Sequence, residues 1–142
     1  MNEIASYPSL ENKVVIVTGG ASGIGESIVE QFVIQKSKVA FIDIEEKLAK
    51  NLIERINKKY NTKPLFIKCD LKNISELKDS IQQVKQDLGP ISILINNAAN
   101  DERHNIDDVT SEYWDDRMNI NLKHYFFATQ SVYKDMKKLG KG

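Results

Sequence analysis

Apolar runs and helical stripes alternate along the chain from residue 13 onward. A continuous apolar run at residues 14–17 ends in a glycine-rich turn, and apolar positions at helical spacing follow that turn. Similar runs stand at 39–42, 65–67 and 91–95. Continuous apolar runs, as opposed to alternating ones, are typical of strands buried on both faces of a sheet. The pattern therefore predicts four strands separated by helices.

The last two helical stripes carry signals of their own. Residues 74–88 repeat apolar side chains every three or four positions, and Asn73 with Glu76 in front of them resembles a capping box. The stripe over residues 111–138 is longer than the roughly 25 residues at which a single globular helix becomes suspect. We therefore expect a bend or break in it near residues 119–121.

Strands that alternate with helices imply βαβ units, whose crossovers are nearly always right-handed. The predicted fold class is α/β, a Rossmann-like doubly wound parallel sheet with the strand order 3-2-1-4. Ligands of such sheets bind beyond the carboxyl ends of the strands. The polar or glycine residues that follow the four predicted strands are Gly19, Asp43, Asp70 and Asn97. We expect these residues to meet at one edge of the sheet.

The composition is that of one ordinary globular domain over residues 1–142, with 41% hydrophobic and 28% charged residues. Twenty Lys and Arg residues balance twenty Asp and Glu residues, so the chain has no basic footprint for nucleic acid. No apolar run approaches the roughly 18 residues of a membrane span. We expect neither a nucleic-acid nor a membrane partner, and the cytoplasm as the compartment. One cysteine and two isolated histidines show no metal-ligand spacing, so we expect no metal.

Residues 18–25, Thr-Gly-Gly-Ala-Ser-Gly-Ile-Gly, join the first predicted strand to the first helix. Glycines there let the backbone turn tightly and approach a pyrophosphate, whose charge is met by free amide groups and by the positive end of the helix dipole. A P-loop is disfavoured because no Lys-Ser or Lys-Thr follows the glycines. The segment predicts a dinucleotide-phosphate loop, and the alternative is a glycine-rich turn without a ligand.

Asp43 lies close to the position, about 20 residues after the first glycine, where an acid accepts hydrogen bonds from an adenosine ribose. Such a carboxylate repels a 2′-phosphate, and no Arg or Lys stands at residues 22–24 or 44 to bind one. The sequence therefore favours NAD over NADP. The alternative for Asp43 is a cap on the next helix, and Asp70 could equally be an ordinary acid at the start of a loop.

Two of these motifs resemble those of the short-chain dehydrogenases/reductases. Residues 18–25 are similar to the Thr-Gly-x-x-x-Gly-x-Gly loop of that family, and residues 96–99, Asn-Asn-Ala-Ala, resemble its Asn-Asn-Ala-Gly signature, with Ala99 as a departure. The resemblance implies an NAD-dependent oxidoreductase that transfers a hydride from a hydroxyl carbon to NAD. The cofactor-binding residues that it implies are Gly19, Ser22, Gly23, Ile24, Asp43, Asp70, Leu71, Asn97 and Ala98.

Residues 119–122, Asn-Ile-Asn-Leu, resemble the family segment whose second Asn sits at a helix break and anchors a catalytic proton relay. The resemblance thus implies that Asn121 is a catalytic residue. The next histidine, His124, lies within the helical pattern, and we interpret it as a packing or surface residue.

The loop at residues 96–104, together with 113–115 and 121–127, is similar to members of the family that oxidise aldoses at the anomeric carbon to lactones. This finer resemblance implies a small-molecule alcohol or sugar as the substrate. The alternative for residues 101–104 is a solvated polar loop, because charge clusters on loops are common.

Members of the family act through a Ser and a Tyr-x-x-x-Lys motif on a later helix. Tyr133 and Lys137 have that spacing, but they share a predicted helix with Asn121, and Tyr133 fits its apolar stripe. We therefore expect residues 1–142 to stop before the true catalytic segment and to be inactive alone. We also expect a homo-oligomer formed through the long final helix. The alternative is a non-catalytic nucleotide-binding or interaction module, a truncated gene product.

Overall fold

A computed structural model describes residues 5–142, so the first four positions of the predicted domain lie outside the described residues. Strands and helices alternate in the described part, and a short π-helical turn separates the last two helices. The elements are β1 (Val14–Thr18), α1 (Gly23–Ile34), β2 (Lys38–Asp43), α2 (Glu46–Tyr60), β3 (Leu65–Lys68), α3 (Ile74–Leu88), β4 (Ile93–Ile95), α4 (Ser111–Met118), the π turn (Asn119–Lys123) and α5 (His124–Leu139).

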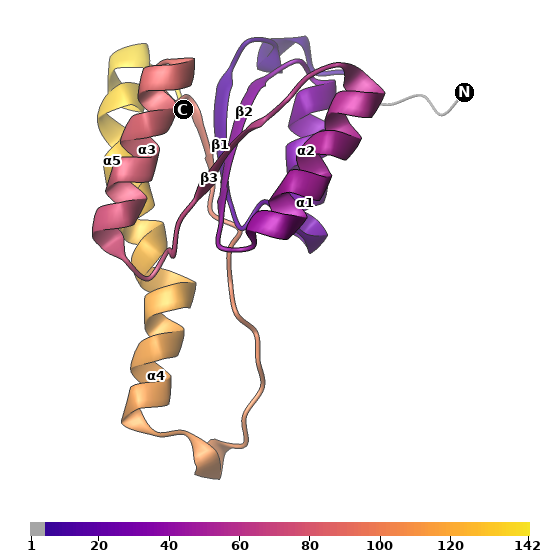
Figure 1. Cartoon of the computed structure of the whole chain (residues 1–142). Coiled ribbons are helices and arrows are strands. Elements are labelled where there is room, and N and C mark those ends of the chain that lie inside the picture. Colours follow the sequence, from indigo (N-terminus) through magenta and orange to yellow (C-terminus); the bar gives the residue numbers. More distant parts are fainter. Residues whose placement is uncertain (1–4) are drawn as a thin grey trace.

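The strands form one parallel sheet in the order β3-β2-β1-β4, which confirms the predicted α/β fold and its strand order. Helices α1 and α2 cover one face of the sheet, and α3 and α5 cover the other (Figure 1). All five residues of β1 are buried, because this strand has a neighbour on both sides and helices on both faces. Its carboxyl end therefore lies at the centre of one edge.

Successive side chains of β1 point into two separate cores. Val15 and Val17 pack with α1 and α2, whereas Val14 and Ile16 pack with α3 and α5. This alternation follows from the two-residue period of a strand. It explains why the strand reads as an unbroken apolar run, since neither face of the sheet meets water at this position.

Helix α3 begins as its sequence predicts. The Asn73 side chain accepts hydrogen bonds from the backbone N–H groups of Ser75 (3.1 Å) and Glu76 (3.3 Å). The Glu76 carboxylate accepts from the side-chain amide of Asn73 at 2.8 Å, where a standard capping box would use the backbone N–H of the cap. Two of the N–H groups that a helix leaves unpaired at its start are thus satisfied.

The long final stripe is broken where the sequence predicts a break. Helix α4 ends at Met118, the π turn occupies Asn119–Lys123, and α5 starts at His124. A π turn inserts an extra residue into a helix and often marks a functional position. Helix α4 and the loop before it extend beyond the carboxyl edge of the sheet (Figure 1). We call residues 100–118 the arm.

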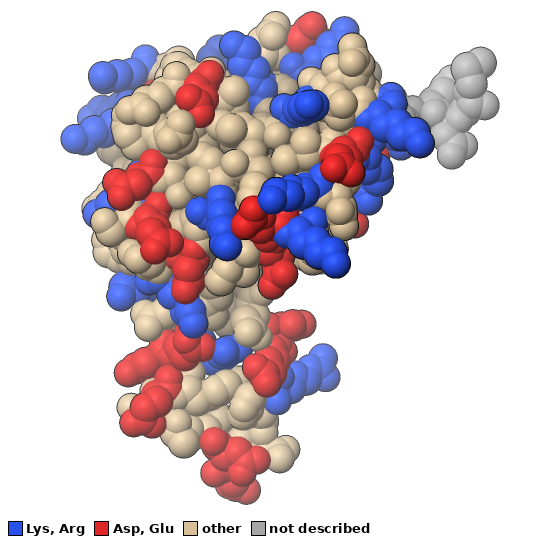
Figure 2. Space-filling view, viewed as in Figure 1, with Lys and Arg blue, Asp and Glu red and all other residues tan. Residues whose placement is uncertain are grey.

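Acidic side chains gather over the arm (Figure 2). Only two basic residues, Arg103 and Arg117, stand among them. The acids of the arm are Asp101, Glu102, Asp107, Asp108, Glu112, Asp115 and Asp116. This part of the molecule is therefore strongly negative, although the whole chain has no net charge.

His124 is fully buried on the side of α5 that also carries Ala128 and Val132, so its predicted role in packing is confirmed. Within residues 5–142, neither ring nitrogen has a hydrogen-bond partner. Burial lowers the pKa of His124 because the imidazolium form loses its hydration, and the nearby Ile120 backbone offsets only part of this shift. The buried ring is therefore favoured in its neutral form.

The opposite side of the last two helices exposes apolar side chains. Trp114, Leu122 and Phe126 are 59%, 55% and 63% exposed, and they recur at multiples of four residues across α4, the π turn and α5. Met118, at 37% exposure, completes this row. We call these four residues the apolar stripe. In the described part of the chain, no helix is long and apolar enough to cross a membrane.

Candidate cofactor site

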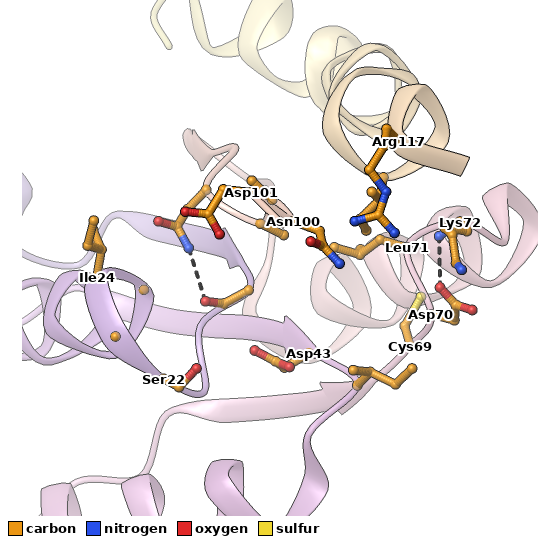
Figure 3. A pocket seen from close by; sticks show the side chains of 18 of the residues that line it. Ser22, Ile24, Asp43, Cys69, Asp70, Leu71, Lys72, Asn100, Asp101 and Arg117 are labelled. Carbon is orange, nitrogen blue, oxygen red and sulfur yellow. Dashed lines mark hydrogen bonds between the residues drawn. The ribbon is translucent and has the colours of Figure 1, made fainter. Parts of the chain in front are cut away.

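A cavity of about 640 Å³ opens at the carboxyl edge of the sheet. Every residue that the sequence predicts to bind a cofactor lines this cavity, although these residues come from four loops far apart in the chain. Figure 3 shows Asp43 and Asp70 on adjacent walls, with Ser22 and Ile24 at the start of α1. The lining residues of the prediction are Gly19, Ser22, Gly23, Ile24, Asp43, Asp70, Leu71, Asn97 and Ala98.

Two glycines where the turn after β1 meets α1, Gly19 and Gly25, have no room for a side chain. Gly19 has a φ of +66°, and a Cβ atom there would lie 2.8 Å from the Cα atom of Ala98. A Cβ atom on Gly25 would lie 1.9 Å from the carbonyl oxygen of Gly19 and 2.8 Å from the amide nitrogen of Asn97. Helix α1 therefore presses directly against the turn, and only glycines at these two positions allow the approach.

Thr18 and Asn97 join this turn to the loop after β4. The Thr18 hydroxyl accepts hydrogen bonds from the backbone N–H groups of Asn97 (3.0 Å) and Ala98 (3.2 Å). In return, the Asn97 side-chain amide donates to the carbonyl oxygens of Thr18 (3.1 Å) and Gly19 (3.0 Å). Asn97 thus holds the turn in place as well as lining the cavity. Thr18 belongs to the predicted Thr-Gly-x-x-x-Gly-x-Gly loop, but the sequence does not predict that its hydroxyl binds the loop after β4.

The start of α1 is left open toward the cavity. Its N-cap residue, Ser22, makes no side-chain hydrogen bond to the helix. The first amide groups of an α-helix have no partner within the helix, and the helix dipole makes this end positive. Together with the Cβ-free cradle at Gly19, the open end fits a pyrophosphate group without any side-chain cation.

Asp43 is 9% exposed and has both carboxylate oxygens engaged by the protein. One oxygen accepts from the backbone N–H of Ala21 at 2.9 Å, and the other accepts from that of Glu45 at 3.0 Å. The second bond lies before α2, whose N-cap is Glu45 without a side-chain capping hydrogen bond, so Asp43 holds the turn ahead of the helix and does not cap it. Each carboxylate oxygen has two lone pairs, so one acceptor site on each stays available to a ribose hydroxyl.

The far wall of the cavity is built from charged residues. One Asp70 oxygen accepts from the backbone N–H of Lys72 at 3.0 Å (Figure 3). The Lys72 ammonium lies 3.0 Å from one Asp116 oxygen, and Arg117 lies 2.6 Å from the other. Side-chain hydrogen bonds from these two cations lower the pKa of Asp116. Neither cation is predicted at the cavity from the sequence, and both are paired with Asp116.

Asn121 does not line the cavity. Its side-chain oxygen accepts from the backbone N–H of Asn100 at 2.7 Å, and its side-chain nitrogen donates to the carbonyl oxygen of Asn100 at 2.9 Å. The π turn therefore aims this amide at the loop after β4, which it holds by both backbone groups of one residue.

Tyr133 and Lys137 lie away from the cavity on α5. Tyr133 is 58% exposed, so no part of the site surrounds its hydroxyl. Across residues 5–142, no group of three or more potential ligand side chains is placed to hold a metal ion. The residues at this edge can bind and orient a dinucleotide, and within the described residues they include no tyrosine.

The sequence model of the family described as short chain dehydrogenase matches residues 13–142. The chain belongs to the short-chain dehydrogenase family. The match begins just before β1 and includes every element that borders the cavity. The sequence resemblance is thereby confirmed at the level of the family.

Among relatives in this family, D-xylose 1-dehydrogenase of Caulobacter vibrioides is 41% identical over 138 residues, which are 97% of this chain and 54% of that protein. The ligand-free aldohexose dehydrogenase of Thermoplasma acidophilum is 31% identical with a TM-score of 0.78, over 93% of this chain and 47% of that one. A blue fluorescent protein from a metagenomic library, solved with NADPH, is 28% identical with a TM-score of 0.81, over 88% and 51%.

The chain thus spans about half the length of the short-chain dehydrogenases that it matches. Members of this family bind nicotinamide cofactors. The cavity fits such a cofactor, because its backbone cradle and open helix start suit a pyrophosphate.

Proposed function

We propose that this chain provides the cofactor site of an NAD-dependent dehydrogenase that oxidises an aldose at its anomeric carbon to a lactone. The observation that carries the proposal is the meeting of the Gly19 turn, the open start of α1 and Asp43 in one cavity. The aldose is supported by the xylose and aldohexose dehydrogenases to which the chain is similar. The cytoplasm, expected from the composition, is part of this proposal.

The reaction takes a hydride from the anomeric carbon and a proton from its hydroxyl group, and the carbonyl of the lactone forms. NAD, when bound, supplies the acceptor for the hydride. The Gly19 turn and the start of α1 would hold the pyrophosphate, and Asp43 would accept hydrogen bonds from the adenosine ribose. Asp70 and Leu71 would border the adenine. Among residues 5–142, no tyrosine lines the cavity to take the proton.

NAD is expected to bind more tightly than NADP. Asp43 is buried and held by two backbone N–H groups, so its carboxylate cannot swing away from a 2′-phosphate. The two cations of the cavity wall, Lys72 and Arg117, are both engaged by Asp116. In Asp43→Ala, NAD should lose about 1–3 kcal/mol of binding free energy, because the ribose loses a charged acceptor.

Titration of NADH and NADPH by fluorescence, for wild type and Asp43→Ala, measures both effects. Circular dichroism is the control for folding, because Asp43 also holds the Ala21 and Glu45 amides. Equal affinities of the wild type for the two cofactors would contradict the assignment of NAD.

We propose that Asn121 serves proton transfer as a positioning residue. Its side chain is fully occupied by the backbone of Asn100, so it acts through the loop that it holds. Asn100 itself lines the cavity. The position of Asn121 in the π turn supports this role, since such turns recur at functional positions.

We further propose that a second copy of this chain covers the apolar stripe. Its four side chains form one exposed row along α4 and α5, and such rows mark interaction surfaces. A twofold axis would place the two rows against each other, because the same patch then serves both subunits. Light scattering at micromolar concentration should therefore show a dimer or larger assembly.

The variant Phe126→Glu places a charge at the α5 end of the stripe, on its most exposed side chain, and should yield a smaller species. Ile106→Glu is the matched control, because Ile106 is 89% exposed and does not belong to the stripe. A wild-type chain that runs as a monomer would overturn this proposal.

A further inference from the structure

The order of the strands determines which part of a bound dinucleotide lies near which loop. Strands β2 and β3 end at Asp43 and Lys68 on one side of β1, and β4 lies on the other side. With the ribose at Asp43 and the pyrophosphate at the start of α1, the nicotinamide half must extend toward β4. A substrate that reacts with the nicotinamide therefore meets the loop that follows β4.

Three side chains of the helical segment fix this loop from behind. Asn121 binds both backbone groups of Asn100, at 2.7 and 2.9 Å. The Tyr113 hydroxyl donates to the carbonyl oxygen of Glu102 at 3.0 Å, and the Arg117 guanidinium lies 3.8 Å from the Glu102 carboxylate. The residues before and after position 101 are thus both held, and the backbone between them has a defined place.

Asp101 is the residue between these two anchors, and it lines the cavity beside Asn100 (Figure 3). Within residues 5–142, the Asp101 carboxylate takes part in no hydrogen bond or ion pair, whereas that of Glu102 is paired with Arg117. The Asn100 side-chain oxygen accepts from the backbone N–H of Glu102 at 3.0 Å. No partner for the Asn100 side-chain N–H groups occurs in the described part of the chain. The loop thus offers the cavity one carboxylate acceptor and one amide donor.

We propose that Asp101, with the Asn100 amide beside it, is the residue that selects polyhydroxylated substrates. Its carboxylate accepts hydrogen bonds from two neighbouring hydroxyl groups of the sugar, and the Asn100 amide donates to a hydroxyl or ring oxygen. This inference rests on the proposed function, because it places the nicotinamide half of the cofactor at the end of β4.

Asp101 would favour sugars mainly by disfavouring alcohols that have a single hydroxyl group. A carboxylate has about four acceptor sites, and vicinal hydroxyls can satisfy several of them at once. An alcohol with one hydroxyl group and an apolar body would strip water from this carboxylate and leave it unpaired, which is costly. The neighbouring acids of the arm add repulsion against anionic substrates, so neutral polyols are the class that fits.

The experiment uses the chain of residues 1–142 saturated with NADH and titrated with D-xylose or cyclohexanol. Binding is followed by amide NMR shifts. The wild type should bind xylose and not cyclohexanol. Asp101→Asn should weaken xylose binding about tenfold, because a charged hydrogen-bond acceptor is lost. Its affinity for NADH should not change. Asp107→Asn, a charge-matched change on the same arm but outside the cavity lining, should bind xylose like the wild type.

Each outcome decides between the proposals. A wild-type chain that does not bind NADH would refute the proposed function itself. If NADH binds but xylose does not, or if Asp101→Asn binds xylose normally, the role of Asp101 is refuted while the cofactor site stands. Unchanged shifts of Tyr113 and Arg117 in Asp101→Asn show that the arm keeps its fold, so a loss of xylose binding then reports the carboxylate alone.

Discussion

Residues 1–142 mixed with NAD and D-xylose are expected to form no NADH above the uncatalysed rate. Among residues 5–142, the cavity lining includes no tyrosine to take the hydroxyl proton, and a positioned base is typically worth about 10²–10⁴ in rate. Tyr133 cannot replace it, because its hydroxyl lies on the exposed side of α5. The measurement is NADH absorbance over time, with D-xylose, other aldoses and simple alcohols.

NADH binding by the same preparation is the control, since it separates an intact cofactor site from a misfolded chain. Binding without turnover is also the behaviour of a nucleotide-binding module. Turnover that disappears in Tyr133→Phe would show that the Tyr133 and Lys137 pair is catalytic after all. Turnover that survives this change would point to a base that neither the sequence nor the site reveals.

Gly25→Ala is expected to abolish measurable cofactor binding. The new Cβ atom would lie 1.9 Å from the Gly19 carbonyl oxygen, which belongs to backbone and cannot rotate away. The helix and the turn must then separate, and overpacking of this kind costs about 1–3 kcal/mol even before the ligand is considered. The pyrophosphate cradle would also be lost, so we expect NADH affinity to fall by about a hundredfold or more.

Two other variants of α1 serve as controls for the effect of Gly25→Ala on NADH affinity. Gly23→Ala introduces a Cβ atom that meets no atom within 4 Å, so only the positive φ of +57° disfavours it. Ser27→Ala removes an exposed hydroxyl that bonds only to the Gly23 carbonyl. The expected order of NADH affinity is Ser27→Ala above Gly23→Ala above Gly25→Ala. Equal binding by Gly25→Ala and Ser27→Ala would mean that the phosphates bind elsewhere.

The position at which glycine is most strictly required differs from the one that the sequence alone indicates. The motif makes Gly19 and Gly23 the prominent positions, because they stand first in the turn and first in the helix. The structure shows that Gly25 has the least space for a Cβ atom, since this position in α1 faces the Gly19 carbonyl oxygen. A close approach between a helix and a turn depends on the angle at which the helix leaves the strand, and no single residue encodes that angle.

Local patterns were sufficient for the elements and for much of the site. Asn73 caps α3 and the π turn interrupts the last helix as predicted, because both depend on neighbouring residues. Asp43 and Asn97 could be placed at the cavity because a parallel sheet collects the carboxyl ends of its strands. A residue that follows a strand is therefore located by the fold class alone.

The contacts that sequence reasoning missed span long stretches of chain. Lys72 meets Asp116 from 44 positions away, and Thr18 meets Asn97 from 79. The sequence resemblance implies a proton-relay anchor at Asn121, but not the contact that the structure shows between its side chain and the backbone of Asn100. Contacts of this kind depend on how two loops approach each other after the sheet has formed. Residue type and spacing do not predict how the two loops approach each other.

The bonds between Asn97 and the turn after β1 also determine when the site becomes rigid. A ribosome makes the turn long before it makes Asn97, because 79 residues separate Thr18 from its partner. Until β4 emerges and pairs with β1, the carbonyl groups of Thr18 and Gly19 lack the Asn97 amide that holds them. A nascent chain with three paired strands therefore offers a loose cradle to the dinucleotide. The cradle therefore gains its Asn97 anchor only after β4 has been made and has paired with β1.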